Sequence, residues 1–446
     1  MQAQAQAQPL AWQHATALVV ASMVGTGVFT TTGLVLGSVG SPPVVLAIWI
    51  ASGILAVAGA TVYAELGAMM PRAGGEYVYL SRAIHPLAGF LTGWVSVLVG
   101  FAAPIAASAL AFAGYLKTLV PGMPVKPVAI ALIAAVTALH ARNVRRGGTV
   151  QAAMTALTVA LILILIGGAL ISGRIVWSRL WDAGGGATAA APVTASAVAV
   201  ALVYVGYSYC GWNAAAYVAG ELRDPGRTLP RALLGGAGLV TVLYVALNVV
   251  FMTSVPKEVM AGRVEVADVA ARALFGPRGG TALSALVTLA LAGSVSALVM
   301  TGARVLQAMA ADGFFFHAVS RTTAGGAPVV AVLFLGALAV VAAATASFEP
   351  LLVYAGFTLT LGSAATIVAA FVLRWRAPDM PRPYRAMAWP ASGVAYLALA
   401  LFVCSFAVRS RPIESLTGLA TLLAGAVAAM FWRRAPVTDA PSREQR

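Results

Sequence analysis

Residues 13–37 read QHATALVVASMVGTGVFTTTGLVLG, an apolar run that is interrupted at its centre by Gly25-Thr26-Gly27. A helix needs about 20 apolar residues to cross a bilayer, so the run is long enough to span one. Two glycines one residue apart can unwind a helix at that point and leave backbone amides unpaired. Unpaired amides at the start of a half-helix suit a carboxylate, because the helix dipole is positive there. The run therefore predicts a membrane span that is broken in its middle and can bind an anionic group.

The rest of the chain shares this apolar character. Of its 446 residues, 60% are hydrophobic and 9% are charged, and the mean hydropathy is +0.90. Soluble domains carry about 25% charged residues, which excludes a soluble enzyme, a disordered protein and a nucleic-acid-binding domain. Apolar runs bounded by Arg, Pro or Gly predict an all-α polytopic membrane protein of about twelve transmembrane helices. The runs cover residues 13–37, 44–70, 87–116, 128–141, 149–172, 195–220, 231–255, 280–308, 327–346, 350–373, 388–408 and 413–432.

The surplus of positive charge gives the orientation of these spans. The chain has 28 Lys and Arg residues against 14 Asp and Glu, a formal net charge of +14. With the N-terminus in the cytoplasm, 18 of the 28 fall in cytoplasmic segments and 10 outside, and loops rich in Lys and Arg stay inside. We therefore predict a multi-pass protein of the cell membrane with both termini cytoplasmic and no nucleic-acid partner. Residues 1–12 are predicted to be a disordered cytoplasmic tail, and residues 433–446 a second cytoplasmic tail.

A second interruption lies in the apolar run 195–220, at Tyr207-Ser208-Tyr209-Cys210-Gly211-Trp212-Asn213. Interrupted spans at matching positions of two halves are typical of transporters built from inverted repeats. The two interruptions match if residues 13–173 and 195–374 are such repeats, with residues 388–432 forming two further helices. The alternative is that both places are glycine packing contacts between ordinary helices. Since no span centre carries Asp, Lys or Arg, a substrate is expected to be bound by backbone and neutral polar groups.

Four motifs resemble one transporter family. Val24 to Phe29, VGTGVF, resembles the first-helix signature of the amino acid–polyamine–organocation superfamily, and Tyr63 to Phe90 resembles its second-to-third-helix loop. Tyr209 to Arg231 resembles the sixth helix and the following loop of the L-amino acid transporter branch, and Thr301 to Gly313 resembles the end of the eighth helix. The resemblance implies the leucine-transporter-type fold, in which two inverted repeats of five helices are followed by two extra helices. It also implies transport by alternating access.

The resemblance further implies where a substrate is bound. Its carboxylate is expected to meet the amides near Thr26 and Gly27, and its ammonium group the carbonyls near Met23, Tyr207 and Cys210. Tyr207 matches an aromatic gate over the substrate, and a packing or lipid-facing tyrosine is the alternative. The whole predicted substrate-binding set is Met23, Gly25, Thr26, Gly27, Tyr207, Cys210, Gly211, Ser294 and Leu298. Ser294 is explained equally well as a small residue in a packed helix.

Two positions depart from the family pattern. Many sodium-independent members carry a lysine in the fifth helix, where this chain has Thr158 and no lysine in residues 149–172. A neutral threonine cannot carry that charge, so its hydroxyl is either a sodium ligand or faces a neighbouring helix, and proton coupling through a lysine is not expected. Leu298 stands where some relatives that exchange cationic substrates have a tryptophan. Together with the lack of acidic residues near the breaks, the leucine favours a neutral substrate.

The remaining polar residues indicate no catalytic chemistry. Glu65, at the cytoplasmic end of its predicted span, is a candidate for gating or coupling. It either forms an inner gate with Arg72, Arg82 or Arg223, or is an ordinary charge at the end of a helix. The four histidines have no metal-ligand spacing, and no phosphate-binding motif is present, so neither a metal nor a cofactor is expected.

These observations predict a secondary active transporter, a permease that moves amino acids across the membrane as an exchanger or an ion-coupled symporter. Neutral L-amino acids are the favoured substrates, and cationic amino acids or polyamines are the alternative. An intramembrane enzyme needs a polar catalytic pair inside the bilayer, and a channel needs a repeated pore motif. The sequence has neither, so both classes are remote alternatives.

Overall fold

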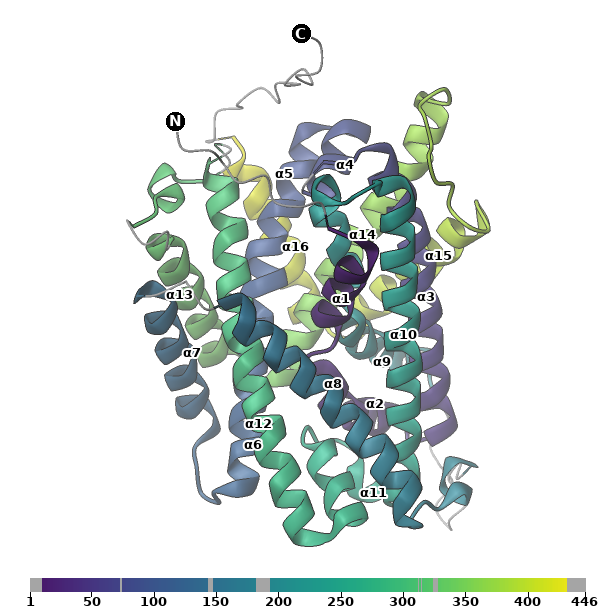
Figure 1. Cartoon of the computed structure of the whole chain (residues 1–446), viewed down its shortest axis with the longest axis vertical. Helices are drawn as coiled ribbons and strands as arrows, with labels where there is room; N and C mark the ends of the chain where they lie inside the picture. Colours follow the sequence, from purple (N-terminus) through teal and green to yellow (C-terminus); the bar gives the residue numbers. More distant parts are fainter. Residues whose placement is uncertain are drawn as a thin grey trace.

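The computed structural model describes residues 10–72, 74–142, 147–181, 193–311, 313, 315–323 and 328–430, which form a bundle of helices (Figure 1). Within these residues, extended pairing is limited to one isolated bridge between Leu10 and Leu222. The all-α fold class is therefore confirmed. Residues 1–9 of the predicted N-terminal tail and the whole predicted tail 433–446 lie outside the described residues.

The helices follow the apolar runs of the sequence. In chain order they are α1 (Trp12–Met23), α2 (Thr31–Val39), α3 (Pro42–Met69), α4 (Glu76–Ala83), α5 (Pro86–Val95), α6 (Ala103–Leu119), α7 (Val125–Arg142), α8 (Gly147–Ser172), α9 (Ala195–Tyr209), α10 (Pro225–Ser254), α11 (Lys257–Met260), α12 (Val266–Ala311), α13 (Val329–Thr345), α14 (Phe348–Arg376), α15 (Ala391–Ser410) and α16 (Pro412–Ala428). Short 3-10 segments are η1 (Gly27–Phe29), η3 (Trp177–Trp181), η4 (Ala214–Glu221) and η5 (His317–Ser320), and a π-helical segment, η2 (Ser96–Ala102), joins α5 to α6.

Nine helical segments, counted within the described residues, are long and apolar enough to cross a membrane. They are Pro42–Met69, Pro86–Leu119, Val125–Arg142, Ala152–Ser172, Ala195–Glu221, Pro225–Ser254, Val266–Ala311, Phe348–Arg376 and Ala391–Ser410. Helices α13 and α16 are apolar but have only 17 residues each. The first predicted span is divided between α1 and α2. This set of helices confirms a polytopic membrane protein.

Two helices begin earlier than predicted, because the prediction ended spans at charged residues and prolines. Helix α12 has 46 residues and reaches back to Val266, whereas the predicted span begins at residue 280. It bends at Gly276, where φ is +75° and glycine is favoured, directly before Pro277. Helix α10 begins at Pro225, because a proline suits the first turn of a helix.

Both predicted interruptions are confirmed as breaks in α-helix. Helix α1 ends at Met23, and regular α-helix resumes at Thr31, after the short turn η1. Helix α9 continues to Tyr209, so the second break begins at Cys210, later than the predicted Tyr207. Gly211 has a φ of +98°, a left-handed value that side chains rarely adopt, and the chain then enters η4.

The first broken segment lies within the bundle, between helices of both halves of the chain. Helix α1 packs on α10, and α2 packs on α9. Figure 1 shows α1 and α2 following one another in the middle of the bundle, with α4 and α11 at its opposite ends. The fold therefore brings the two breaks, almost 200 residues apart in the sequence, to one central region.

Candidate substrate site

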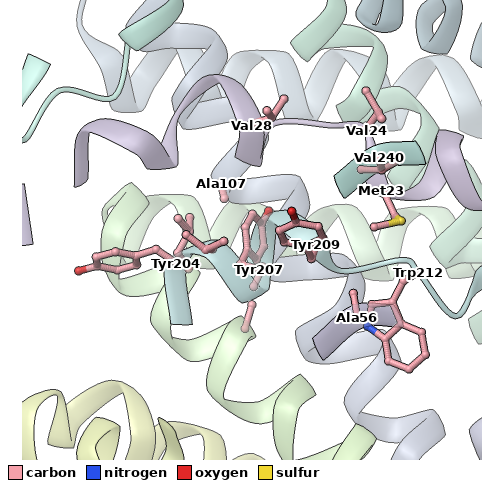
Figure 2. Packing of buried hydrophobic residues seen from close by; sticks show 14 of the residues in the cluster. Met23, Val24, Val28, Ala56, Ala107, Tyr204, Tyr207, Tyr209, Trp212 and Val240 are labelled. Atoms are coloured by element: carbon pink, nitrogen blue, oxygen red, sulfur yellow. The ribbon is translucent and has the colours of Figure 1, made fainter. Parts of the chain in front are cut away.

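The centre of the molecule contains the first break beside the end of α9. Figure 2 shows Val24 and Val28 at the two ends of the non-helical stretch, with Tyr207 and Tyr209 of α9 next to it. The hydroxyls of Thr31 and Ser208 lie 2.9 Å apart, which joins α2 directly to α9. The two interruptions predicted from the sequence therefore lie against each other.

Glycine is required at two contacts between the breaks. A Cβ atom on Gly27 would lie 2.7 Å from the Cα of Ser208, closer than real Cβ contacts. A Cβ atom on Gly211 would lie 2.5 Å from the carbonyl oxygen of Ser22, at a φ that already disfavours side chains. Gly25 differs from both, because a Cβ atom there would meet no atom within 4 Å. Gly27 and Gly211 thus permit close packing, whereas Gly25 borders open space.

The first break exposes a row of backbone donors. The amides of Thr26 and Gly27 donate to no backbone carbonyl in the described part of the chain, whereas the Gly25 amide lies at the hydroxyl of Tyr244. The carbonyls that follow are occupied, because the Thr30 hydroxyl donates to the Thr26 carbonyl at 2.8 Å and the Thr31 hydroxyl to the Gly27 carbonyl at 2.9 Å. Buried amides without a partner are costly. A carboxylate bound here would satisfy them.

The second break exposes backbone acceptors. Among the described residues, the carbonyls of Ser208, Tyr209 and Cys210 accept no backbone hydrogen bond. These carbonyls lie at the C-terminal end of α9, where the helix dipole is negative and favours a cation. Of the acceptors predicted from the sequence, the Tyr207 carbonyl already accepts the Cys210 amide at 3.0 Å. The first break thus supplies free backbone donors, and the end of α9 supplies free backbone acceptors.

Tyr244 of α10 is a site residue that the sequence analysis did not find. Its hydroxyl donates to the Met23 carbonyl at 2.6 Å, and the Gly25 amide lies close to the same hydroxyl. Its ring packs against Tyr209 and Trp49, with centroids at 5.3 and 5.5 Å. Met23 was predicted to bind the substrate ammonium. Its carbonyl has one lone pair occupied by Tyr244 and one left for a further donor.

Helix α6 supports the other end of the first break. The Thr26 and Ser108 hydroxyls lie 2.5 Å apart, and the Tyr115 hydroxyl donates to the Phe29 carbonyl at 2.6 Å. These contacts fix the orientation of η1 and therefore of its free amides. No sequence signal marks Ser108, Tyr115 or Tyr244, because each is an ordinary polar residue within an apolar run.

Three predicted residues have no hydrogen bond to either break in the described part of the chain. The Ser294 hydroxyl bonds to the carbonyl of Ala290 at 3.2 Å, and the Thr158 hydroxyl to that of Met154 at 2.8 Å, one turn back in their own helices. Leu298 is a partly buried residue that packs against the apolar core. Their roles in substrate binding or sodium binding stay predictions.

A cavity of about 70 Å³ lies between α3, α9, α14 and α15. Cys210 is the member of the predicted set that lines it, and Gly206, one turn earlier on α9, lines it as well. Ser208, which contacts Gly27, points to the other side of α9 because neighbours two apart lie on opposite faces. Helix α9 therefore borders the first break on one face and open space on the other.

Glu65 lies in a separate buried cluster near the end of α3. Its carboxylate accepts hydrogen bonds from Arg374 Nε at 2.9 Å and from the Ala386 amide at 2.6 Å, and Arg382 Nε lies at 3.4 Å. Arg374 also lies over the Trp389 ring, 4.3 Å from its centroid. Glu65 thus fastens the end of α14 and the segment before α15 to α3.

The partners of Glu65 differ from those considered in the sequence analysis. We expected Arg72, Arg82 or Arg223, the three arginines considered as partners of Glu65 in an inner gate. Arg374 is 309 residues away in the chain, and no local pattern connects the two. A role of Glu65 in gating stays a prediction, and its buried partners favour a role in holding helices together.

Replacing Tyr244 with phenylalanine is expected to destabilise the protein. It removes the hydroxyl from the Met23 carbonyl and leaves that buried acceptor short of a donor, which costs about 1–3 kcal/mol. The thermal unfolding temperature of the purified protein measures the effect. Tyr354→Phe is the matched control, because the hydroxyl of Tyr354 bonds to the partly buried side chain of Thr421, and its loss is expected to cost less. An unchanged unfolding temperature in Tyr244→Phe would contradict the assignment.

A polytopic helical bundle with two broken helices that meet at its centre defines the class of membrane transporters. The comparison with known families agrees. The chain belongs to the amino acid permease family, which matches residues 10–428. The protein is therefore a transporter of amino acids and not an enzyme.

Similar proteins are found among mammalian transporters. The chain is 32% identical to the large neutral amino acids transporter small subunit 2 of Mus musculus over 442 residues, which are 95% of this chain and 81% of that protein. It is equally similar, at 32%, to the protein of the same name in Homo sapiens, over 95% of this chain and 80% of that protein. It is 29% identical to the b(0,+)-type amino acid transporter 1 of Mus musculus, over 82% of this chain and 76% of that protein.

Proposed function

We propose that this permease is a secondary active transporter of neutral L-amino acids that works by alternating access. The observation that carries the proposal is the meeting of free amides at Thr26 and Gly27 with free carbonyls at the end of α9. A zwitterionic amino acid has one carboxylate and one ammonium group, and the two helix ends match them. The relatives named for large neutral amino acids support the same substrate class.

The neutrality of the substrate side chain follows from the residues around the breaks. The side chains that line them are hydroxyls, a thiol and aromatic rings, including Thr26, Ser108, Ser208, Cys210 and Tyr207. A guanidinium or ammonium side chain would need an acidic partner in such a low-dielectric site. Contrary to the expectation from the sequence, a carboxylate does lie near the second break, that of Glu76, but it already accepts hydrogen bonds from Tyr63 and Asn213. Cationic amino acids or polyamines are the second candidate, and the experiment below separates the two.

The proposed architecture is two inverted repeats of five helices, residues 13–173 and 195–374, followed by α15 and α16. The two-part first span, the nine long apolar segments (which include α9 with η4) and the shorter α13 and α16 supply twelve segments for it. Open space beside Cys210 and Gly206 leaves α9 room to tilt between inward-facing and outward-facing forms. We further propose that the protein lies in the cell membrane with both termini cytoplasmic, as the Lys and Arg distribution favours.

A counterflow screen tests the substrate class. Proteoliposomes loaded with one unlabelled amino acid at a time are given external radiolabelled leucine, and leucine accumulation is measured. We expect acceleration by neutral L-amino acids and none by lysine, arginine or putrescine. Acceleration by the cationic compounds alone would support the second candidate, and the lack of counterflow with every compound would contradict transport.

A further inference from the structure

Glu76 is a buried carboxylate that the proposed transport cycle does not yet use. It is the first residue of α4, between α3 and α5, and is only 8% exposed. Its Oε1 atom accepts a hydrogen bond from the hydroxyl of Tyr63 in α3 and a second, at 3.1 Å, from the Nδ2 of Asn213. Asn213 lies between the second break and η4. One carboxylate therefore connects α3, α4 and the segment between α9 and η4.

Among the residues that the structure describes, the groups that face Glu76 are neutral. The titratable ones are the hydroxyls of Tyr63 in α3, Tyr79 in α4, Tyr217 in η4 and Tyr396 in α15, and the thiol of Cys210 at the second break. Helix α14 faces its Oε2 atom with Gly362, whose Cβ position would lie 3.9 Å away. The carboxylate of Glu65 has a different environment from that of Glu76, because two arginines contact it.

A buried carboxylate surrounded by neutral groups binds a proton more readily than an exposed one, because burial penalises the charged form. Burial raises the pKa of Glu76 above its ordinary value of 4.5, and the hydrogen bonds from Tyr63 and Asn213 offset only part of this shift. Glu76 therefore takes up a proton at a higher pH than an exposed glutamate does.

We propose that Glu76 is the site at which proton binding is coupled to movement of η4, so that the permease is a proton–amino acid symporter. The inference rests on the proposed function. In the charged state, the carboxylate accepts charge-assisted bonds that tie η4 to α3 and α4, and such bonds are about twice as strong as neutral ones. A proton that adds to the carboxylate removes the charge and weakens the bond to Asn213. The proton enters from the outside through the substrate site while it is open to that side, because Asn213, next to the second break, contacts the carboxylate. η4 is then free to move, and the proton leaves once the carboxylate reaches water on the cytoplasmic side.

The test compares driven uptake with exchange in proteoliposomes. An inside-alkaline gradient of one pH unit is expected to raise wild-type leucine accumulation about tenfold for one proton per substrate. Glu76→Gln, which is neutral at every pH, is expected to lose this stimulation and to keep leucine counterflow. Glu258→Gln, at an exposed carboxylate of α11, is the control and is expected to keep both.

A second measurement needs no variant, so it covers the case in which Glu76→Gln does not fold. A pH-sensitive dye sealed inside wild-type proteoliposomes is expected to report acidification when leucine is added outside. Counterflow with neither acidification nor a response to the gradient would overturn the proton site while leaving the proposed function intact. If the pH gradient stimulates leucine accumulation by Glu76→Gln as fully as by the wild type, Glu76 is not the proton-binding residue. The absence of wild-type counterflow would instead count against the proposed function.

Discussion

Replacing Gly25 with valine is expected to abolish amino acid binding while the protein stays folded. A Cβ atom at Gly25 would meet nothing within 4 Å, and the backbone there does not require glycine by its φ. The added methyl groups would fill the space in front of the free amides and exclude a carboxylate. We expect leucine affinity to fall by at least about a hundredfold, roughly 2.8 kcal/mol. Uptake assays together with the thermal unfolding temperature separate this loss from misfolding.

Gly27→Ala is the matched comparison, two residues away. Its Cβ atom would lie 2.7 Å from the Cα of Ser208, so the two broken spans could not approach one another. We expect this smaller substitution to reduce the amount of folded protein, and Ser208→Gly to rescue it only in part because the backbone contact persists. A Gly27→Ala protein with normal stability, or a Gly25→Val protein with normal uptake, would contradict the geometry of the site.

Replacing Glu65 with glutamine is expected to cause a large loss of stability. The carboxylate is 2% exposed and is contacted by Arg374, Arg382 and the Ala386 amide. Removing one partner of a buried ion pair leaves an uncompensated charge and costs about 3–5 kcal/mol. The unfolding temperature of the purified protein in detergent is the measurement.

Glu349→Gln supplies the control for this prediction. Glu349 pairs with Arg411, but both side chains are 35% exposed, and exposed ion pairs contribute only about 0–1 kcal/mol. We therefore expect Glu349→Gln to lower the unfolding temperature much less than Glu65→Gln does. If Glu65→Gln keeps normal stability but loses transport, Glu65 acts as a gate rather than as a structural tie.

The sequence was sufficient to predict features that depend on local composition. Apolar runs located the spans, because a bilayer demands them wherever a helix crosses it. The glycines of VGTGVF and the polar residues around Gly211 located both breaks, because an interruption of helix is also a local property. The second break begins at Cys210 rather than Tyr207, since nothing in the composition of Tyr207 to Tyr209 prevents helix.

Contacts between distant helices could not be predicted in the same way. Tyr244, Tyr115 and Ser108 are single polar residues in apolar runs, and only the packing of α10 and α6 against the first break gives them partners. The arginines that bind Glu65 come from the other end of the chain for the same reason. The pattern of one sequence indicates which residues enter the membrane but not which of them meet.

Direct binding of radiolabelled leucine to the purified protein tests the central claim, that the two breaks form the substrate site. We predict saturable binding to the wild type, displaced by other neutral L-amino acids, and no measurable binding to Gly25→Val of equal thermal stability. Binding of equal affinity to the wild type and to a folded Gly25→Val protein would contradict the account.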